Sequence, residues 1–156
     1  MCMWCDRIIP YASGYLRIPA IVIRDACYII KEAAENRRYI CYSELMEKLK
    51  AMGHRKINRG TIGWIVGEVS NKIAINTNPS IYPSAIVVRK GTQSPGSGFW
   101  TLKVGTDPPS KVSSSRRRYA LLRYQHAVFM SNWKCCSEDK NRKSKDYDVG
   151  VIIYGK

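Results

Sequence analysis

Four of the six cysteines lie near the ends of the chain, where their thiolates could bind a metal ion. Cys2 and Cys5 form a C-x-x-C pair, and Cys135 and Cys136 are adjacent. Three or four such thiolates can hold a structural zinc ion if the two ends of the chain meet. The alternative is four terminal thiols without a role, because no local segment has the doubled C-x-x-C spacing typical of zinc sites.

The other two cysteines, Cys27 and Cys41, lie in apolar periodic segments, and we expect them to be buried as small hydrophobic side chains. The first residues contain no basic leader followed by an apolar segment, so secretion is not indicated. We therefore expect a reducing compartment, either the cytoplasm or the nucleoid or nucleus, and no structural disulfides. The longest apolar stretch, residues 18–30, is interrupted by Arg24 and Asp25 and is shorter than the ~20 residues that cross a bilayer, so no membrane span is expected.

Residues suited to catalysis are sparse and dispersed. The two histidines, His54 and His126, fall in different predicted elements, and a lone histidine is more often structural or solvated than catalytic. A metal-dependent nuclease needs clustered carboxylates, but the chain has twelve acidic residues without a D-x-D, E-x-K or H-x-x-H arrangement in a strand context. The sequence therefore predicts neither an enzyme nor a cofactor.

Basic residues are the prominent chemical feature. The chain carries 26 Lys and Arg against 12 Asp and Glu, a formal net charge of +14, which creates a field that attracts polyanions. Its basic clusters fall at a predicted interhelical turn, in a Gly/Pro-rich loop and along a C-terminal helix: Arg55, Lys56 and Arg59; Arg89 and Lys90; Arg116, Arg117 and Arg123. These residues are the candidate contacts to nucleic acid.

Three helices are expected to position the first cluster. Apolar spacing predicts a long buried helix over residues 18–37, and a brief extended piece over residues 39–41 follows it. Ser43 is expected to cap a second helix that ends at Gly53, and Asn58 to cap a third with an inward apolar stripe. Glycines 60, 63 and 67 share one side of that third helix, which indicates close approach by another helix or by a nucleic-acid backbone.

Two strands over residues 85–88 and 99–104 are expected to pair around a flexible tip at residues 91–98 and so form a wing. A basic helix is expected over residues 114–134. Its inward stripe would be Tyr119, Leu122, His126, Phe129 and Trp133. Residues 1–134 would form one domain, residues 135–148 a flexible charged segment, and residues 149–156 a strand-like piece for a sheet edge in this chain or a partner.

Three motifs follow one another through the middle third of the chain: Tyr42-Ser43-Glu44-Leu45, Arg59 followed by Ile62-Gly63, and Pro83-Ser84-Ala85-Ile86-Val87-Val88 with a glycine-rich segment up to Phe99. In this order they resemble the Tyr-x-x-Leu, Arg-x-Val-Gly and Pro-Cys-His-Arg-Val-Val motifs of O6-alkylguanine-DNA alkyltransferases and alkyltransferase-like proteins. The second motif has one additional residue here. The resemblance implies a winged-helix DNA-binding domain, in which Tyr42 and Arg59 would help hold an extruded nucleotide from the minor-groove side.

The departures from the family pattern exclude alkyl transfer. Ser84 and Ala85 occupy the positions of the reactive Cys and its His, and Ile86 replaces the Arg. The alkyltransferase-like proteins, which lack the cysteine yet bind DNA, are the closer comparison.

These observations together predict an α+β protein, a winged helix-turn-helix with a long N-terminal helix, a two-stranded wing and a basic C-terminal helix. We expect it to be non-enzymatic and to bind duplex DNA. The first alternative is binding to RNA or single strands, which aromatic residues among the cations would suit: Trp64, Trp100, Tyr119, Tyr124 and Trp133. The second is an adaptor or inhibitor that binds another protein.

Overall fold

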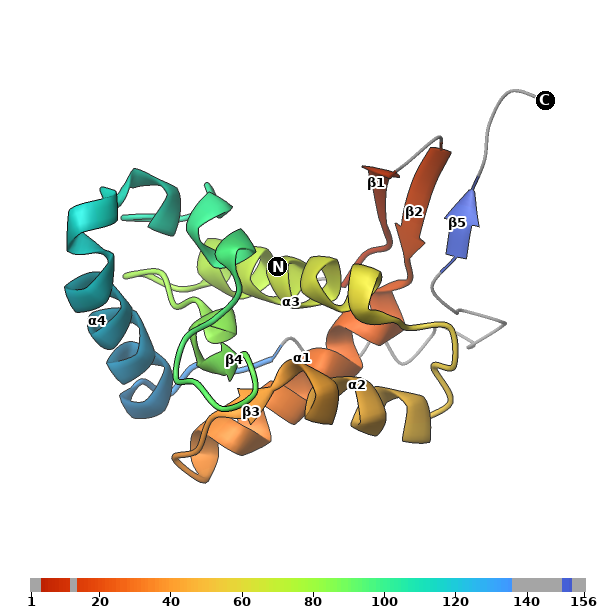
Figure 1. Ribbon diagram of the computed structural model, residues 1–156, viewed down its shortest axis with the longest axis horizontal. Helices are drawn as coiled ribbons and strands as arrows, with labels where there is room; N and C mark the ends of the chain where they lie inside the picture. The colour runs from red at the N-terminus through yellow and green to blue at the C-terminus, as the bar shows by residue number, and fades with distance from the viewer. Residues whose placement is uncertain (1–3, 12–13, 136–149, 153–156) are drawn as a thin grey trace.

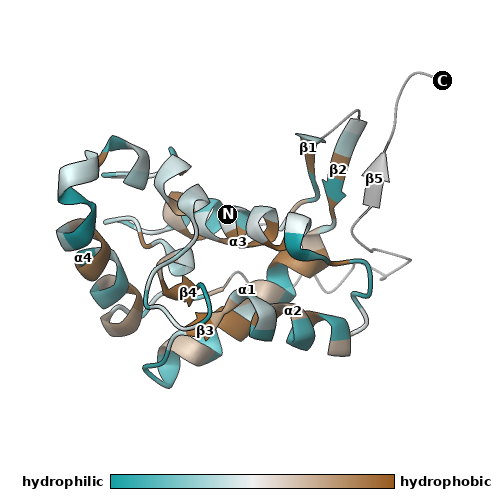
Figure 2. Ribbon diagram, in the orientation of Figure 1, coloured by the Kyte–Doolittle hydropathy of each residue, from teal (hydrophilic) through white to brown (hydrophobic). Residues whose placement is uncertain are grey.

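The described part of the chain combines four α-helices with two small β-sheets, so its class is α+β as expected (Figure 1). The computed structural model describes residues 4–11, 14–135 and 150–152. Hydrophobic residues lie along the central helix and the short sheet beside it, whereas the connection between the second and third helices is hydrophilic (Figure 2). No helix in the described ranges is long and apolar enough to cross a membrane.

The central helix is α1, Ala20–Glu35, which begins directly after Pro19 in extended conformation. Proline suits this boundary because its fixed φ does not disturb the start of a helix. One face of α1 is fully buried against α2 and α3. The prediction of a long buried helix in this region is therefore confirmed, with ends two residues inside the expected bounds.

A hairpin precedes α1 and was not predicted. Strand β1, Arg7–Tyr11, pairs antiparallel with β2, Gly14–Ile18, and β5, Gly150–Ile152, adds to the other edge of β2. The expected strand-like piece at the C-terminal end is thus present as β5. Strand β5 adds to a sheet of this same chain, because it pairs with β2 and Val151 lies opposite Leu16.

Two helices follow, and the first does not begin as expected. Helix α2, Tyr42–Ala51, starts after Cys41, so the prediction that Ser43 caps it is wrong: the extended strand β3, Ile40–Cys41, runs directly into the helix. Gly53 has a φ of 104°, which lets the chain leave the helix without the cost of a Cβ in the left-handed region.

Helix α3, Arg59–Asn76, begins as expected at Asn58. The Asn58 side chain accepts hydrogen bonds from the backbone N–H groups of Gly60 and Thr61, at 2.8 and 3.1 Å. The Thr61 hydroxyl accepts the Asn58 N–H at 3.0 Å, which completes a reciprocal cap. The start of this helix is therefore well defined by its own residues.

The two-stranded wing is a wrong prediction. Residues Pro83–Ile86 form a 3-10 helix, and strand β4, Val87–Val88, pairs in parallel with β3. Ser97–Thr101 is also a 3-10 helix, in which the Phe99 and Trp100 rings meet edge to face with centroids 4.9 Å apart. Because both rings pack into the same region, this segment cannot alternate its side chains as a strand does.

The last helix is α4, Arg117–Met130, which follows a 3-10 turn at Ser114–Arg116. It ends before residue 134, and its expected inward stripe is wrong for its first three members: Tyr119, Leu122 and His126 are exposed. The buried face instead carries Ala120, Tyr124, Gln125 and Val128. Both faces contain apolar residues at helical spacing, so local periodicity could not identify the buried one.

Candidate nucleic-acid interface

Charge is divided unevenly along the chain. Residues 1–47 carry six acidic and six basic side chains, whereas residues 48–134 carry fifteen basic and two acidic ones. The two acids of the second part, Glu68 and Asp107, both form ion pairs with arginines, at 3.0 Å from Arg7 and 3.3 Å from Arg123. The end of α2, all of α3, the loops after it and α4 therefore form a strongly cationic part of the molecule.

The turn between α2 and α3 holds the first predicted cluster. Arg55, Lys56 and Arg59 are all exposed there. The turn is fixed from inside by buried His54, whose Nε2 lies 2.7 Å from Asp25 of α1, and by Ile57, which is buried in the core. The buried side chains of His54 and Ile57 fix the backbone of the turn, so the exposed cations beside them form a defined outer surface.

The loop over residues 89–98 holds the second cluster, and it is a closed turn. The backbone N–H of Arg89 donates to the carbonyl of Ser94 at 3.0 Å, and the Thr92 hydroxyl donates to the carbonyl of Arg89 at 2.8 Å. Arg89 and Lys90 are exposed on it. This loop occupies the place that was predicted for the wing.

Two side chains from other elements hold the loop in position. The Tyr42 hydroxyl, at the start of α2, accepts the Gly96 N–H at 2.9 Å. On the other side, Gln125 of α4 donates to the carbonyls of Gln93 and Ala85, at 2.8 and 3.0 Å. Burial raises the pKa of Tyr42 above its usual value, while the Gly96 hydrogen bond and the positive charge of Arg89 act in the opposite direction. The structure thus brings Tyr42 and Arg89 together, and Gln125 is a positioning residue that sequence analysis missed.

The third cluster lies elsewhere. Arg116, Arg117 and Arg123 are exposed along α4, with the Arg117 guanidinium 5.2 Å from the centroid of the Trp100 ring. In Figure 1, α4 and the α2–α3 connection lie at opposite ends of the long axis of the molecule. The predicted site residues therefore form separate clusters along the molecule instead of one compact patch.

The outer side of α3 is open at one glycine. A Cβ built on Gly63 would meet no atom within 4 Å, and neighbouring Trp64 is 44% exposed. The close neighbour expected at these glycines is present only at Gly60, where a Cβ would lie 2.9 Å from the Tyr11 hydroxyl of β1. The approaching group is a strand side chain, so the expectation of another helix is wrong.

Ser84, at the position that the resemblance aligns with the reactive cysteine of alkyltransferases, is buried. Its hydroxyl accepts a hydrogen bond from the Ser70 hydroxyl at 2.6 Å, and its backbone N–H donates to the same Ser70 oxygen at 2.9 Å. Both contacts join the 3-10 helix to α3. Ser84 is therefore part of the packing between these elements, and its hydroxyl and backbone N–H both bond to Ser70.

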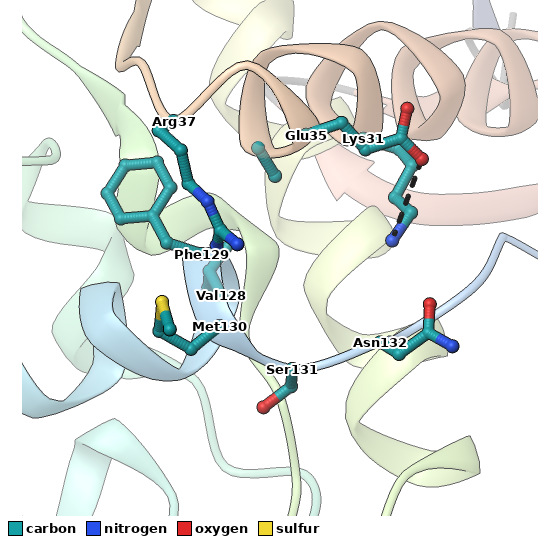
Figure 3. A pocket seen from close by; sticks show the side chains of 9 residues that line it. Lys31, Glu35, Arg37, Val128, Phe129, Met130, Ser131 and Asn132 are labelled. Carbon is teal, nitrogen blue, oxygen red and sulfur yellow. Dashed lines mark ion pairs between the residues drawn. The ribbon is translucent and has the colours of Figure 1, made fainter.

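Two pockets lie away from the cationic turn and loop. One, of about 230 Å³, separates α1 from the end of α4, and Figure 3 shows Arg37 extending into it beside Phe129. The other, of about 410 Å³, lies between residues 77–81 and α4. Neither is lined by Tyr42, Arg59 or Ser84, the positions that the family resemblance associates with an extruded nucleotide.

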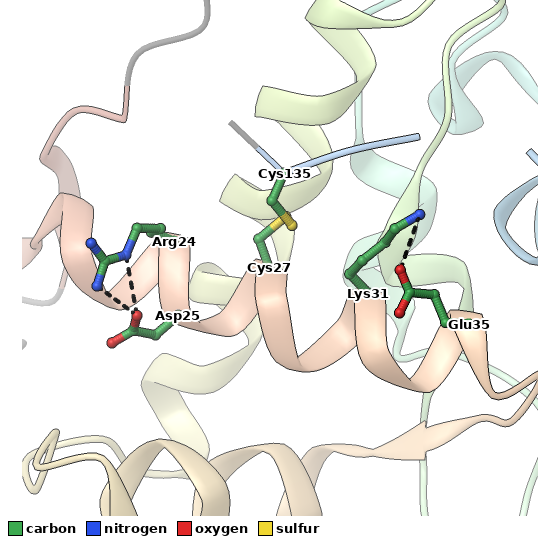
Figure 4. Close-up of a disulfide and its surroundings, with 6 residues drawn as sticks. All are labelled: Arg24, Asp25, Cys27, Lys31, Glu35 and Cys135. Carbon is green, nitrogen blue, oxygen red and sulfur yellow. Dashed lines mark hydrogen bonds and ion pairs between the residues drawn. A yellow bond between two sulfur atoms is a disulfide. The ribbon is translucent and has the colours of Figure 1, made fainter. Parts of the chain in front are cut away.

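The cysteines follow a different pattern from the one expected. Cys27 of α1 is buried, as predicted, but it forms a disulfide with Cys135, so the expectations of no structural disulfides and of a Cys135 thiol are wrong (Figure 4). Cys2 and Cys136 lie outside the described residues, while Cys5 is an exposed thiol and Cys41 a partly exposed one. Among residues 4–11, 14–135 and 150–152, no group of three His, Cys, Asp or Glu could hold a metal ion.

No protein-family model matches this chain, and neither a curated protein nor a solved structure matches it. The resemblance to alkyltransferases therefore depends on the order of three short motifs.

Proposed function

We propose that this chain is a non-enzymatic, winged-helix type protein that binds duplex DNA through separate basic clusters spaced along the molecule, on α3, on the loop over residues 89–98 and at the start of α4. The observation that carries the proposal is the charge of residues 48–134. This part of the chain has fifteen basic and two acidic side chains, and both acidic side chains form ion pairs with arginines. Such a surface gains affinity by releasing the counterions condensed on a polyanion. It fits a location where DNA is accessible, in the cytoplasm, nucleoid or nucleus.

Helix α3 supplies the part that would enter a groove. Its N-terminal end is capped by Asn58 and flanked by the exposed cations Arg55 and Arg59, which are suited to hold phosphates on either side. The absence of a side chain at Gly63 allows a close approach of the helix backbone to DNA. Trp64 supplies a flat apolar surface next to this opening.

The loop over residues 89–98 would act as the wing. The loop donates a hydrogen bond to the Tyr42 hydroxyl and accepts one from the Gln125 amide, which hold it in place without a second strand. Arg89 and Lys90 therefore extend from a fixed backbone. Preorganised cations lose less conformational freedom on binding than cations on a loose loop. The motif order shared with alkyltransferase-like proteins supports the same assignment, and the hydrogen-bonded, buried Ser84 supports binding without alkyl transfer.

A salt series of affinities tests the proposal. Duplex DNA, single-stranded DNA and RNA of equal length would be titrated with the purified chain by fluorescence anisotropy. We expect duplex DNA to bind most tightly, with log affinity falling linearly against log salt. Tighter binding to single strands or RNA would replace duplex DNA as the partner, and a salt-independent affinity would refute the electrostatic basis.

A protein partner is the second candidate, and the outer face of α4 favours it. Tyr119, Leu122 and Met130 share this face and are 79%, 60% and 60% exposed. Leucine and methionine side chains have no use in phosphate contacts, and exposed apolar residues at helical spacing are typical of helix-mediated interfaces. Replacing Leu122 and Met130 by serine should leave DNA affinity unchanged and abolish a protein interaction through this face.

A further inference from the structure

The segment that follows α4 is fastened to α1 at two neighbouring positions. Cys27 and Lys31 lie one helical turn apart, so both point to the same side of α1. Cys27 is bonded to Cys135 (Figure 4). The Lys31 ammonium lies 4.7 Å from the centroid of the Trp133 ring. Residues 131–135 therefore lie along α1, held by one covalent bond and one cation–π contact.

Burial and hydrogen bonding make this segment part of the structure. Cys27 is fully buried, Trp133 is buried, and the Trp133 indole N–H donates to the carbonyl of Val128 at 2.9 Å. Ser131 and Asn132 line both pockets described above, the one between α1 and α4 and the one against residues 77–81. Displacing residues 131–135 would thus join the two pockets and expose apolar surface of α1.

We propose that Cys27 and Cys135 are a reversible thiol–disulfide pair, which we call the latch. Oxidation of the pair holds residues 131–135 against α1, and its reduction lets this segment move away from α1. The proposal is independent of DNA binding. In a reducing compartment the open state would be the resting one and oxidation the signal.

The closing step is thiol–disulfide exchange with a low-molecular-weight disulfide such as oxidised glutathione. The Cys135 thiolate, which is the more exposed of the two, attacks one sulfur and releases the first small thiol. The Cys27 thiolate then attacks Cys135 and releases the second. The two cysteines lose two electrons and two protons, the small disulfide gains them, and a dithiol reductant reverses the reaction.

The rest of α4 should remain in place when the latch opens. Ala120, Tyr124 and Gln125 are buried along its inner face, and Gln125 also holds the loop over residues 89–98. Reduction therefore removes one attachment at the end of the helix, while the attachments along its length persist. We therefore expect only residues near the disulfide to move on reduction. A disulfide that the whole fold required would instead cause global unfolding when reduced.

Hydrogen exchange followed by mass spectrometry on the full chain tests this. One buffer would contain oxidised glutathione and the other reduced glutathione. We expect reduction to speed exchange in peptides covering residues 128–135 by at least tenfold while peptides covering residues 117–125 change little, and Cys135 to be alkylated faster than Cys27. Equal exchange in both buffers, or both cysteines still alkylated after incubation with oxidised glutathione, would overturn the proposal.

Two variants sharpen the test. Cys135→Ser should show the reduced pattern in both buffers, whereas Cys5→Ser, which changes an exposed thiol outside the pair, should respond as the unmodified chain does. If Cys135→Ser does not fold, comparing hydrogen exchange of the unmodified chain in the two buffers still tests the proposal. Global unfolding on reduction would also contradict a local latch.

Discussion

The imidazole Nε2 of His54 lies 2.7 Å from one carboxylate oxygen of Asp25, and both side chains are buried. The other oxygen of Asp25 accepts two N–H groups from the neighbouring Arg24, at 3.2 and 3.0 Å. This pair joins the middle of α1 to the turn that carries Arg55 and Lys56. A turn with exposed cations is thus positioned by a buried polar contact from another helix.

Removing the acceptor of this pair should destabilise the fold. Asp25→Ala leaves the His54 imidazole buried without its hydrogen-bond partner, and a buried polar group left without a partner costs about 1–3 kcal/mol. We expect urea unfolding to show a loss of that size. Glu32→Ala, which removes an exposed carboxylate from the same helix, is the control and should change the free energy of unfolding by less than about 0.5 kcal/mol. Equal losses in the two variants would mean that the His54 contact contributes nothing specific.

Two glycines of α3 should respond in opposite ways to alanine. Gly63→Ala adds a methyl group that meets no atom, so we expect a gain of about 0.5–1 kcal/mol from helix propensity. Gly60→Ala places a Cβ 2.9 Å from the Tyr11 hydroxyl and 3.2 Å from the capping oxygen of Asn58, so it should destabilise.

A larger residue at the open position separates stability from binding. Gly63→Glu should leave the chain folded and abolish DNA binding, because it adds bulk and negative charge where a groove would approach. Thermal unfolding and anisotropy titration of the same samples would check this. Undiminished affinity of Gly63→Glu would exclude this side of α3 from the interface.

Cations of the turn and of the loop should contribute to DNA affinity in an additive and salt-dependent way. Arg59→Ala and Arg89→Ala should each reduce the slope of log affinity against log salt by about one. The control is Arg38→Ala, because Arg38 lies in the balanced part of the chain, 3.1 Å from Glu44. If Arg38→Ala has the same effect, binding follows net charge and not the proposed surface.

The buried tyrosines should make the protein sensitive to alkali. Burial raises the pKa of Tyr82 and of Tyr124 above the usual tyrosine value of 10.0, so the unfolded state loses these protons first. Stability is then retained below pH 10.0 and falls as the pH rises toward the folded-state pKa values.

Tyr82→Phe should weaken this decline, at the cost of about 1–2 kcal/mol at neutral pH for the lost hydrogen bonds to the carbonyls of Val104 and Thr106. Tyr119→Phe, on an exposed residue, should not alter the alkaline decline in urea unfolding.

Sequence reasoning worked where the deciding contacts are local. The start of α3 was predicted from Asn58, and the structure shows the cap complete within four residues. It did not work for α4, because Tyr119 and Leu122 have the same helical spacing as a buried stripe, and packing of Tyr124 and Val128 selects the opposite face. It also did not work for the wing, because Val87 and Val88 pair with Ile40 and Cys41.

By itself the sequence determined the class of the fold, the helices around Asn58 and the concentration of positive charge, since each depends on residue types over a short stretch. Only the tertiary structure decided which distant residues meet: Cys27 with Cys135 across 108 positions, and His54 with Asp25 between two helices. Such pairs form when many elements pack at once, and no local spacing encodes the distance between two side chains that are far apart in the chain.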